Sequence, residues 1–174
     1  NRKKVNCTID CFLQKEKEMP ISLGDISEWN FFLHGLKQRY GQDAEIERFV
    51  ENKSPYRFMQ YFDSLTQTDD VICADIGQNQ MWAAQTLRLK SGQKFVTSGG
   101  LAPMGFSLPV AIGCSFANPN KKVFSINGDG GFHMAIQSLM LISQYNLPIK
   151  VIILNNASLG MITQFQHLYF DDRM

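Results

Sequence analysis

The chain has 174 residues, of which 44% are hydrophobic and 19% charged, and its formal net charge at pH 7 is +1. This length and hydrophobic fraction fit about one domain with a sizeable core. The near-neutral charge, without a basic stripe interleaved with aromatic residues, argues against a nucleic-acid partner. No apolar run approaches the roughly 20 residues that a membrane helix needs. We therefore expect neither nucleic acid nor a membrane among the partners.

The start of the chain and its cysteines bear on the cellular compartment of the protein. No apolar segment follows the basic residues 1–4, so a secretory signal is not evident. The first residue is not Met, which suggests a fragment or a processed chain. Cys73 and Cys114 lie in apolar runs, which favours buried free thiols in a reducing compartment. We expect a cytoplasmic protein.

Residues 1–54 contain two segments with regular patterns. Val5–Leu13 is a short β-like run, and a charged stretch follows it. Ile26–Tyr40 has aromatic and aliphatic residues at helical spacing, with Asp25 or Ser27 as a candidate N-cap. Gly41 is suited to stopping this helix.

The polar, charged residues 42–55 are typical of a linker, with a short helix at Ala44–Val50. We place the domain boundary in this stretch. The prediction is a first part at 1–54, a remnant of a preceding domain plus linker, and a second domain at 55–174.

The second domain begins with alternating helical and β-rich segments. Tyr56–Leu65 is an amphipathic helix and Val71–Ala74 a short apolar strand, followed by a polar turn. Phe95–Thr97 is the next strand, and Phe106–Phe116 the next helix. This alternation is typical of an α/β domain.

The central stretch is a β-α-β unit. Val123–Ile126 is a β-rich apolar run that a glycine-rich turn stops. A helical run begins at Phe132, and Ile149–Leu154 is a second buried strand. The two strands should therefore be parallel and adjacent.

Polar residues follow both of these strands. Asp129 comes after the first strand and Asn156 after the second. In a parallel sheet the carboxyl ends of the strands share one edge, so the two side chains can face the same point. Their oxygens suit Mg²⁺ or Ca²⁺, while Gly130 and Gly131 expose backbone N–H groups at a helix N-terminus. The pattern indicates a metal-bridged diphosphate.

Other readings of the glycine-rich turn are weaker. Gly-Asp-Gly alone occurs in many ordinary turns. No Gly-Lys-Ser/Thr follows, which excludes a Walker loop, and Phe132 breaks the spacing of a dinucleotide fingerprint. A strand leads into the turn, which excludes an EF-hand.

The segment from Gly128-Asp129-Gly130 to Asn155-Asn156 resembles the fingerprint of thiamine diphosphate-dependent enzymes. The wider sequence is similar to the catalytic subunit of the acetolactate (acetohydroxyacid) synthase family. Four ordered motifs carry this likeness: Gly77–Gln85, Ser98–Phe106, Leu108–Gly113 and Leu159–Gln164.

The resemblance implies a set of site residues. Asp129, Asn156 and the main-chain carbonyl of Ser158 would hold Mg²⁺. Residues that would bind the cofactor are Gln78, Asn79, Ala102, Met104, Gly128, Asp129, Gly130, Gly131, Asn156, Ser158, Leu159, Gly160 and Met161. Met104 would lie beneath the cofactor ring. Met161 and Phe165, on a helix at Leu159–His167, would line the substrate channel.

Three positions depart from the family's usual pattern. Asn79 stands where His is usual, and it can donate to a phosphate oxygen but cannot carry a positive charge. Ala102 replaces a glycine. Phe165 stands where many members carry a Trp that is associated with the choice of 2-ketobutyrate.

The implied fold is a three-layer α/β sandwich with a mostly parallel sheet, incomplete at its C-terminus. The implied activity depends on thiamine diphosphate and Mg²⁺, with FAD allowed in the full-length enzyme. Pyruvate would lose CO₂ and its two-carbon unit would pass to a second 2-keto acid, in branched-chain amino acid biosynthesis. A homodimer or tetramer is implied.

The resemblance also implies that this chain holds no catalytic residue. The activating Glu of the family lies in an N-terminal domain, so the chain alone is expected to be inactive. Two alternatives stay open. One is a related decarboxylase or carboligase acting on another 2-keto acid, and the other is a non-catalytic regulatory or assembly domain.

Overall fold

The computed structural model describes residue 14, residues 24–49, residue 51 and residues 54–173. The predicted β-like run Val5–Leu13 lies outside these residues. The chain divides into two compact units, Asn1–Glu45 and Ile46–Met174. This division lies inside the predicted linker at residues 42–55, ahead of the 54/55 limit given to the second domain, and each unit is described by itself.

The first unit contains helix α2, Ser27–Tyr40. Its N-cap is Ile26, so neither Asp25 nor Ser27 takes that position. Asp25 nevertheless accepts the Ser27 backbone N–H at 2.9 Å. Hydrogen bonds from the Ser27 side chain and backbone lower the pKa of the Asp25 carboxyl. Gly41 is the C-cap, as predicted, and its N–H donates to Lys37 O at 2.8 Å.

Helix α3, Gln42–Phe49, begins two residues before the predicted short helix. Helix α4, Pro55–Leu65, confirms the predicted amphipathic helix. Ser54 is its N-cap, and the Ser54 side chain accepts a backbone N–H of the first turn. The Arg57 guanidinium donates to Glu47 at 2.5 Å, which ties the end of α3 to α4.

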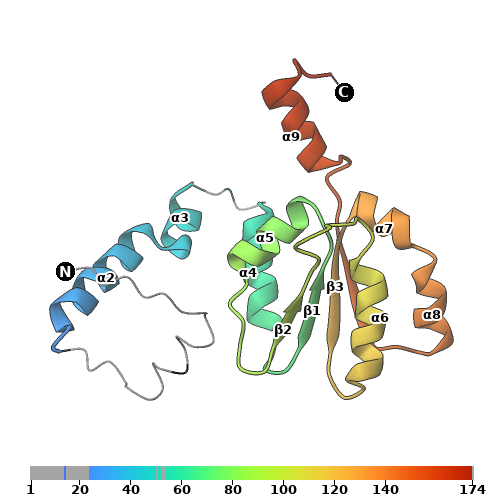
Figure 1. Cartoon of the computed structure of the whole chain (residues 1–174), viewed down its shortest axis with the longest axis horizontal. Coiled ribbons are helices and arrows are strands. Elements are labelled where there is room, and N and C mark those ends of the chain that lie inside the picture. Colours follow the sequence, from blue (N-terminus) through green and yellow to red (C-terminus); the bar gives the residue numbers. More distant parts are fainter. Residues whose placement is uncertain (1–13, 15–23, 50, 52–53, 174) are drawn as a thin grey trace. The chain divides into compact units, whose positions relative to one another are not determined.

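The second unit is built on one four-stranded sheet, and every pair of neighbouring strands is parallel. In chain order the strands are β1 (Val71–Ala74), β2 (Lys94–Val96), β3 (Val123–Gly128) and β4 (Ile149–Leu154). They lie side by side in the order β2-β1-β3-β4 (Figure 1). The predicted parallel pairing of β3 with β4 is confirmed, since Gly128 lies opposite Leu154.

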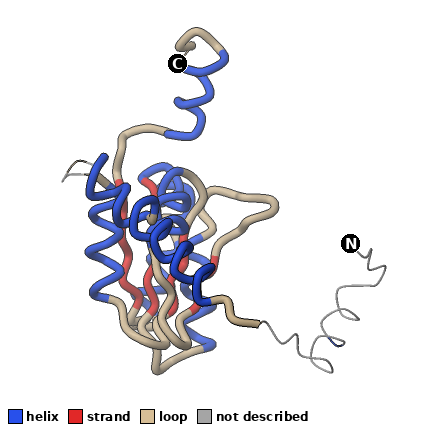
Figure 2. The backbone as a smooth tube through the Cα atoms, turned by 90° about the vertical axis from the view of Figure 1, so that its left-hand side faces the viewer, coloured by secondary structure: helices blue, strands red, loops and turns tan. Residues whose placement is uncertain are grey.

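Helices cover both faces of the sheet. They are α4 with α5 (Gln78–Thr86) on one face, and α6 (Ser107–Ala117), α7 (Asp129–Ala135) and α8 (Ser138–Gln144) on the other. Figure 2 shows the strands between these helices and α9 (Gly160–Tyr169) beyond the carboxyl ends of the strands. This arrangement confirms the three-layer α/β prediction. In the described part of the chain, no helix is long and apolar enough to cross a membrane.

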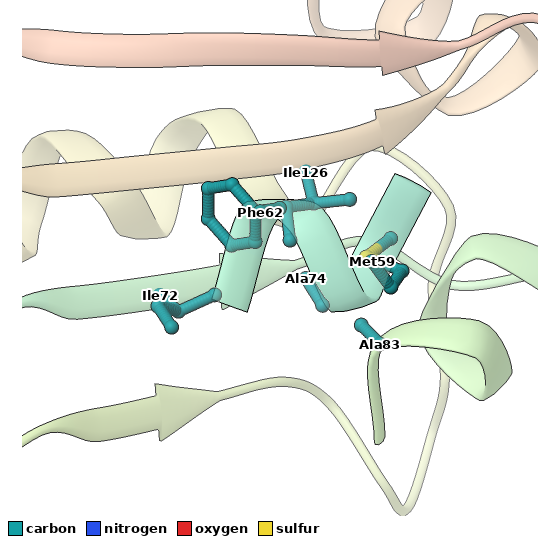
Figure 3. Packing of buried hydrophobic residues seen from close by; sticks show 6 residues of the cluster. All are labelled: Met59, Phe62, Ile72, Ala74, Ala83 and Ile126. Carbon is teal, nitrogen blue, oxygen red and sulfur yellow. The ribbon is translucent and has the colours of Figure 1, made fainter. Parts of the chain in front are cut away.

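The hydrophobic core has two halves because the sheet is buried on both faces. One half lies under α4 and α5, and Figure 3 shows its members: Met59, Phe62, Ile72, Ala74, Ala83 and Ile126. The other half lies under α6 and consists of Val71, Cys73, Ala111 and Val123. Alternate residues of β1 therefore pack into opposite halves.

The helical run predicted from Phe132 is two helices, so the prediction of one continuous helix was wrong. Residues 136 and 137 form a turn between α7 and α8. There Leu139 N donates to Ile136 O at 3.0 Å, and Met140 N donates to Gln137 O at 3.1 Å. These three-residue bonds are tighter than those of an α-helix and interrupt it.

The predicted buried thiol at Cys73 is confirmed, because Cys73 is fully buried and free. Burial raises the pKa of the Cys73 thiol well above its usual value, and neighbouring Cys114 raises it further. The thiol therefore stays protonated and unreactive at pH 8. We expect iodoacetamide to label Cys73 only after unfolding, as read by peptide mass mapping. Cys114, also predicted to be buried, is free but only partly buried and serves as the control. Equal labelling of both thiols in the native protein would contradict this.

Candidate functional site

The candidate site lies where β1 and β3 end side by side. The chain leaves β1 through α5 toward β2, and it leaves β3 through α7 and α8 toward β4. These connections run over opposite faces of the sheet (Figure 1). A crevice forms at such a switch point, outside the carboxyl ends of the strands, and ligands of α/β proteins bind there.

A cavity occupies this position. It is lined by Ile76, Gly77, Gln78, Asn79, Trp82, Met104, Gly128, Asp129, Gly130, Gly131, Leu154, Asn156, Ser158, Leu159, Gly160, Met161 and Ile162. Of the residues that the sequence suggested for the cofactor and the channel, all but Ala102 and Phe165 are in this lining.

Five lining residues were absent from the sequence-based set: Ile76, Gly77, Trp82, Leu154 and Ile162. Four of them are apolar and form part of the wall. Trp82 and Leu154 lie inside or at the end of regular elements, where an apolar residue signals core as readily as a cavity wall. The sequence therefore does not distinguish Trp82 and Leu154, as residues of the cavity wall, from ordinary core residues.

The polar groups suggested for a metal converge in the cavity. One terminal atom of the Asn156 amide lies 3.1 Å from Asp129 Oδ1 and 2.7 Å from the carbonyl oxygen of Ser158. With nitrogen in that place the amide donates to both oxygens. With oxygen in that place, Asn156 Oδ1 accepts the Ser158 backbone N–H at 3.3 Å. Asn156 Nδ2 then donates to Gln78 Oε1 at 3.1 Å.

The second orientation groups three oxygens that repel one another unless a cation lies among them. Octahedral Mg²⁺, with Mg–O distances of about 2.1 Å, separates neighbouring ligand oxygens by about 3 Å. The spacing around Asn156 is of this size. No group of three His, Cys, Asp or Glu residues suited to a metal occurs among the described residues. The donor set, one carboxylate with two neutral oxygens, therefore fits Mg²⁺ better than zinc.

Two glycines let the cavity walls approach closely. A Cβ on Gly130 would lie 2.7 Å from Leu159 Cδ2 and 3.1 Å from Met104 Cε. A Cβ on Gly160 would overlap Gln78 Oε1. Side chains at these positions would fill the space that a ligand needs.

Asn79 is buried and its amide nitrogen is already engaged. Nδ2 donates to Asp75 O at 3.1 Å and to Ile126 O at 3.4 Å. The side chain thus links the end of β1 to β3. The remaining polar atom of the amide, Oδ1, is an acceptor and cannot donate to a phosphate oxygen.

Ala102 and Phe165 lie away from the cavity lining. Ala102 is exposed, and its φ of 49° is in the left-handed region that favours glycine. Phe165 is 54% exposed on α9 and packs against Tyr169, with ring centroids 5.5 Å apart.

Comparison with known proteins adds independent information. Residues 75–174 match the family described as thiamine pyrophosphate enzyme, C-terminal TPP binding domain. The chain is 39% identical over 173 residues to "Acetolactate synthase 2, chloroplastic" of Brassica napus, covering 97% of this chain and 27% of that protein. It is 44% identical over 119 residues to "Acetolactate synthase large subunit" of Lactococcus lactis subsp. lactis, covering 68% of this chain and 21% of that protein.

A third relative is "Acetolactate synthase large subunit" of Corynebacterium glutamicum. It is 35% identical over 161 residues, covering 92% of this chain and 26% of that protein. The chain thus spans about a quarter of the length of the curated relatives that it matches.

Proposed function

Because the chain belongs to the thiamine pyrophosphate enzyme family, by its match to the C-terminal TPP-binding domain, we propose that it is the diphosphate-binding part of an acetolactate synthase-like enzyme. That enzyme decarboxylates pyruvate and transfers the two-carbon unit to a second 2-keto acid. The observation that carries the proposal is the convergence of Asp129, Asn156 and the Ser158 carbonyl at the ends of two parallel strands. The relatives named acetolactate synthase support the choice of reaction.

In this proposal each group at the cavity has one task. Asp129, Asn156 and the Ser158 carbonyl would hold Mg²⁺, which would supply positive charge for the diphosphate. Gln78, within 3.1 Å of Asn156, orients that amide. Met104 would support the cofactor ring; its methyl group lies 3.1 Å from the position of a Cβ on Gly130. Thiamine diphosphate, when bound, supplies the carbon nucleophile and the electron sink for decarboxylating a 2-keto acid.

The residues of this chain bind and orient rather than move protons. Among the described residues that line the cavity, Asp129 is the only acid, and the metal would engage it. By the likeness to the family, the activating Glu would lie in another domain of the enzyme. The same likeness extends the proposal to a homo-oligomer, FAD in the full-length enzyme and a role in branched-chain amino acid biosynthesis. The free thiols Cys73 and Cys114 support a reducing, cytoplasmic setting.

A second candidate is a related decarboxylase or carboligase acting on another 2-keto acid. Asn79 motivates it as a departure from the His usual in acetolactate synthases, and the nitrogen of its amide binds two backbone carbonyls. Phe165, which stands outside the cavity lining, is the other departure. A non-catalytic assembly domain is the weakest candidate, since it would have no need of converging metal ligands.

The test is a product assay of the full-length enzyme with thiamine diphosphate and Mg²⁺. With pyruvate alone we expect acetolactate, and we expect the 174-residue chain alone to release no CO₂. Release of an aldehyde without acetolactate would favour the decarboxylase. Failure of the full-length enzyme to bind thiamine diphosphate in the presence of Mg²⁺ would reject both.

A further inference from the structure

Asp75, at the carboxyl end of β1, is a fully buried acid that does not line the cavity. Its Oδ1 accepts the Ile76 backbone N–H at 2.9 Å and the Phe106 N–H at 3.0 Å. Its Oδ2 accepts the Gly105 N–H at 3.1 Å. The carboxylate thus binds three backbone donors from two segments about 30 residues apart.

Two of these donors belong to the loop that leads into α6. Gly105 and Phe106 immediately precede that helix, and Phe106 is its N-cap. Backbone N–H groups at a helix start have no partner within the helix, and a carboxylate there satisfies them and interacts favourably with the helix dipole. A buried carboxylate needs such donors, because it has lost its water. Asp75 and the loop therefore depend on each other.

A third segment closes over the same carboxylate. Gly131, in the first turn of α7, packs so closely that a Cβ there would overlap Asp75 Oδ2. Gly105 has a φ of 83°, and a Cβ on it would lie 3.2 Å from Met134 Cβ of α7. The end of β1, the loop before α6 and the start of α7 thus meet at Asp75.

Met104 is the residue next to this junction. It precedes Gly105, whose N–H binds Asp75, and its Cε lies 3.1 Å from the position of a Cβ on Gly130. Met104 lines the cavity, whereas Asp75 does not. Any shift of the Gly105 and Phe106 amides would move the Met104 backbone, and with it the side chain that faces the cavity.

We infer that Asp75 is a positioning residue, whose buried carboxylate holds the loop of Met104 against the first turn of α7 and so sets the ring-binding side of the cofactor cavity. This inference rests on the proposed function. In this inference, Asp129 and Asn156 form the part of the cavity that binds the metal and diphosphate. The contact between Asp75 and the loop of Met104 shapes the part that binds the cofactor ring. Asp75 hydrogen-bonds the loop but only packs against α7, so we expect its mutation to affect the ring side more than the diphosphate side.

The variant for the test is Asp75→Asn in the full-length enzyme. Asn keeps the shape, but its amide nitrogen would face a backbone N–H, donor against donor. Calorimetry in the presence of Mg²⁺ compares two ligands, thiamine diphosphate and inorganic pyrophosphate, which lacks the ring. We expect the Kd of thiamine diphosphate to rise about tenfold, while the Kd of pyrophosphate stays within about twofold.

Asp70→Asn is the matched control. Asp70 lies just before β1, is 4% exposed, and accepts the Gln67 backbone N–H at 2.7 Å. It is thus a buried acid bonded to a backbone N–H at the opposite end of the same strand. We expect this variant to lower thermal stability without changing the ratio of the two affinities.

The outcomes separate the inference from the proposed function. If Asp75→Asn binds both ligands as the unmodified enzyme does, or weakens both equally, the inference is wrong. If the unmodified enzyme itself binds neither ligand with Mg²⁺, the proposed function fails. A readout that needs no variant is hydrogen exchange of the unmodified enzyme. Slow exchange at the Gly105 and Phe106 amides is expected, and rapid exchange there would overturn the inference even if the variant did not fold.

Discussion

Replacing Asp129 with Asn is expected to weaken the Mg²⁺-dependent binding of thiamine diphosphate by about 100-fold or more. Asp129 is the only acid among the described cavity-lining residues. Its Oδ1 lies 3.1 Å from the Asn156 amide. The substitution keeps the shape and one oxygen but removes the negative charge that attracts the cation.

Calorimetric titration of thiamine diphosphate, with and without Mg²⁺, measures this effect. The matched control is Asp69→Asn, which removes the same charge at the opposite end of the sheet. Asp69 forms an exposed ion pair with Lys121 at 3.3 Å, and such pairs contribute about 1 kcal/mol or less. Metal-dependent binding that survives in the folded Asp129→Asn protein would contradict the site as described.

Replacing Ile126 with Ala is expected to lower the free energy of unfolding by about 2–5 kcal/mol. Ile126 is fully buried in the central strand β3, within the core half under α4 and α5 (Figure 3). Truncation removes apolar contacts and leaves a cavity that rigid neighbours fill only in part. Equilibrium unfolding in urea, followed by circular dichroism, gives the difference.

Ile153→Ala is the control for this prediction. Ile153 is also an isoleucine in a strand, but it lies in the edge strand β4 and is 42% exposed. Its truncation removes less buried surface, so we expect a loss of about 1 kcal/mol or less. Equal losses for the two variants would show that burial in the central strand does not decide stability here.

Local patterns in the sequence determined most of the fold of the second unit. The predicted Val71–Ala74 and Ile149–Leu154 strands match β1 and β4, because short β-rich apolar runs between turn residues have few other ways to be buried. The convergence of Asp129 with Asn156 was also predictable. It follows from one rule, that adjacent parallel strands end at the same edge.

Two local features of the backbone could not be predicted from the pattern of the residues themselves. The break between α7 and α8 at residues 136 and 137 carries neither Gly nor Pro, so no sequence signal marks it. Ala102 lies in the left-handed region, which alanine normally avoids, and only the glycine usual at this position in the resembling family pointed to it.

What only the tertiary structure decided is which polar groups bind one another across long stretches of chain. The sequence suggested that the Asn79 amide donates to a phosphate, but in the fold its nitrogen binds the Asp75 carbonyl just after β1 and the Ile126 carbonyl of β3. Asp75 lies in the polar turn after the first predicted strand, and nothing in the sequence indicates that it binds amides 30 and 31 residues away. Propensity and periodicity describe each residue's neighbours along the chain. Hydrogen bonds between distant segments depend on how the elements pack, and packing is set by the whole core at once.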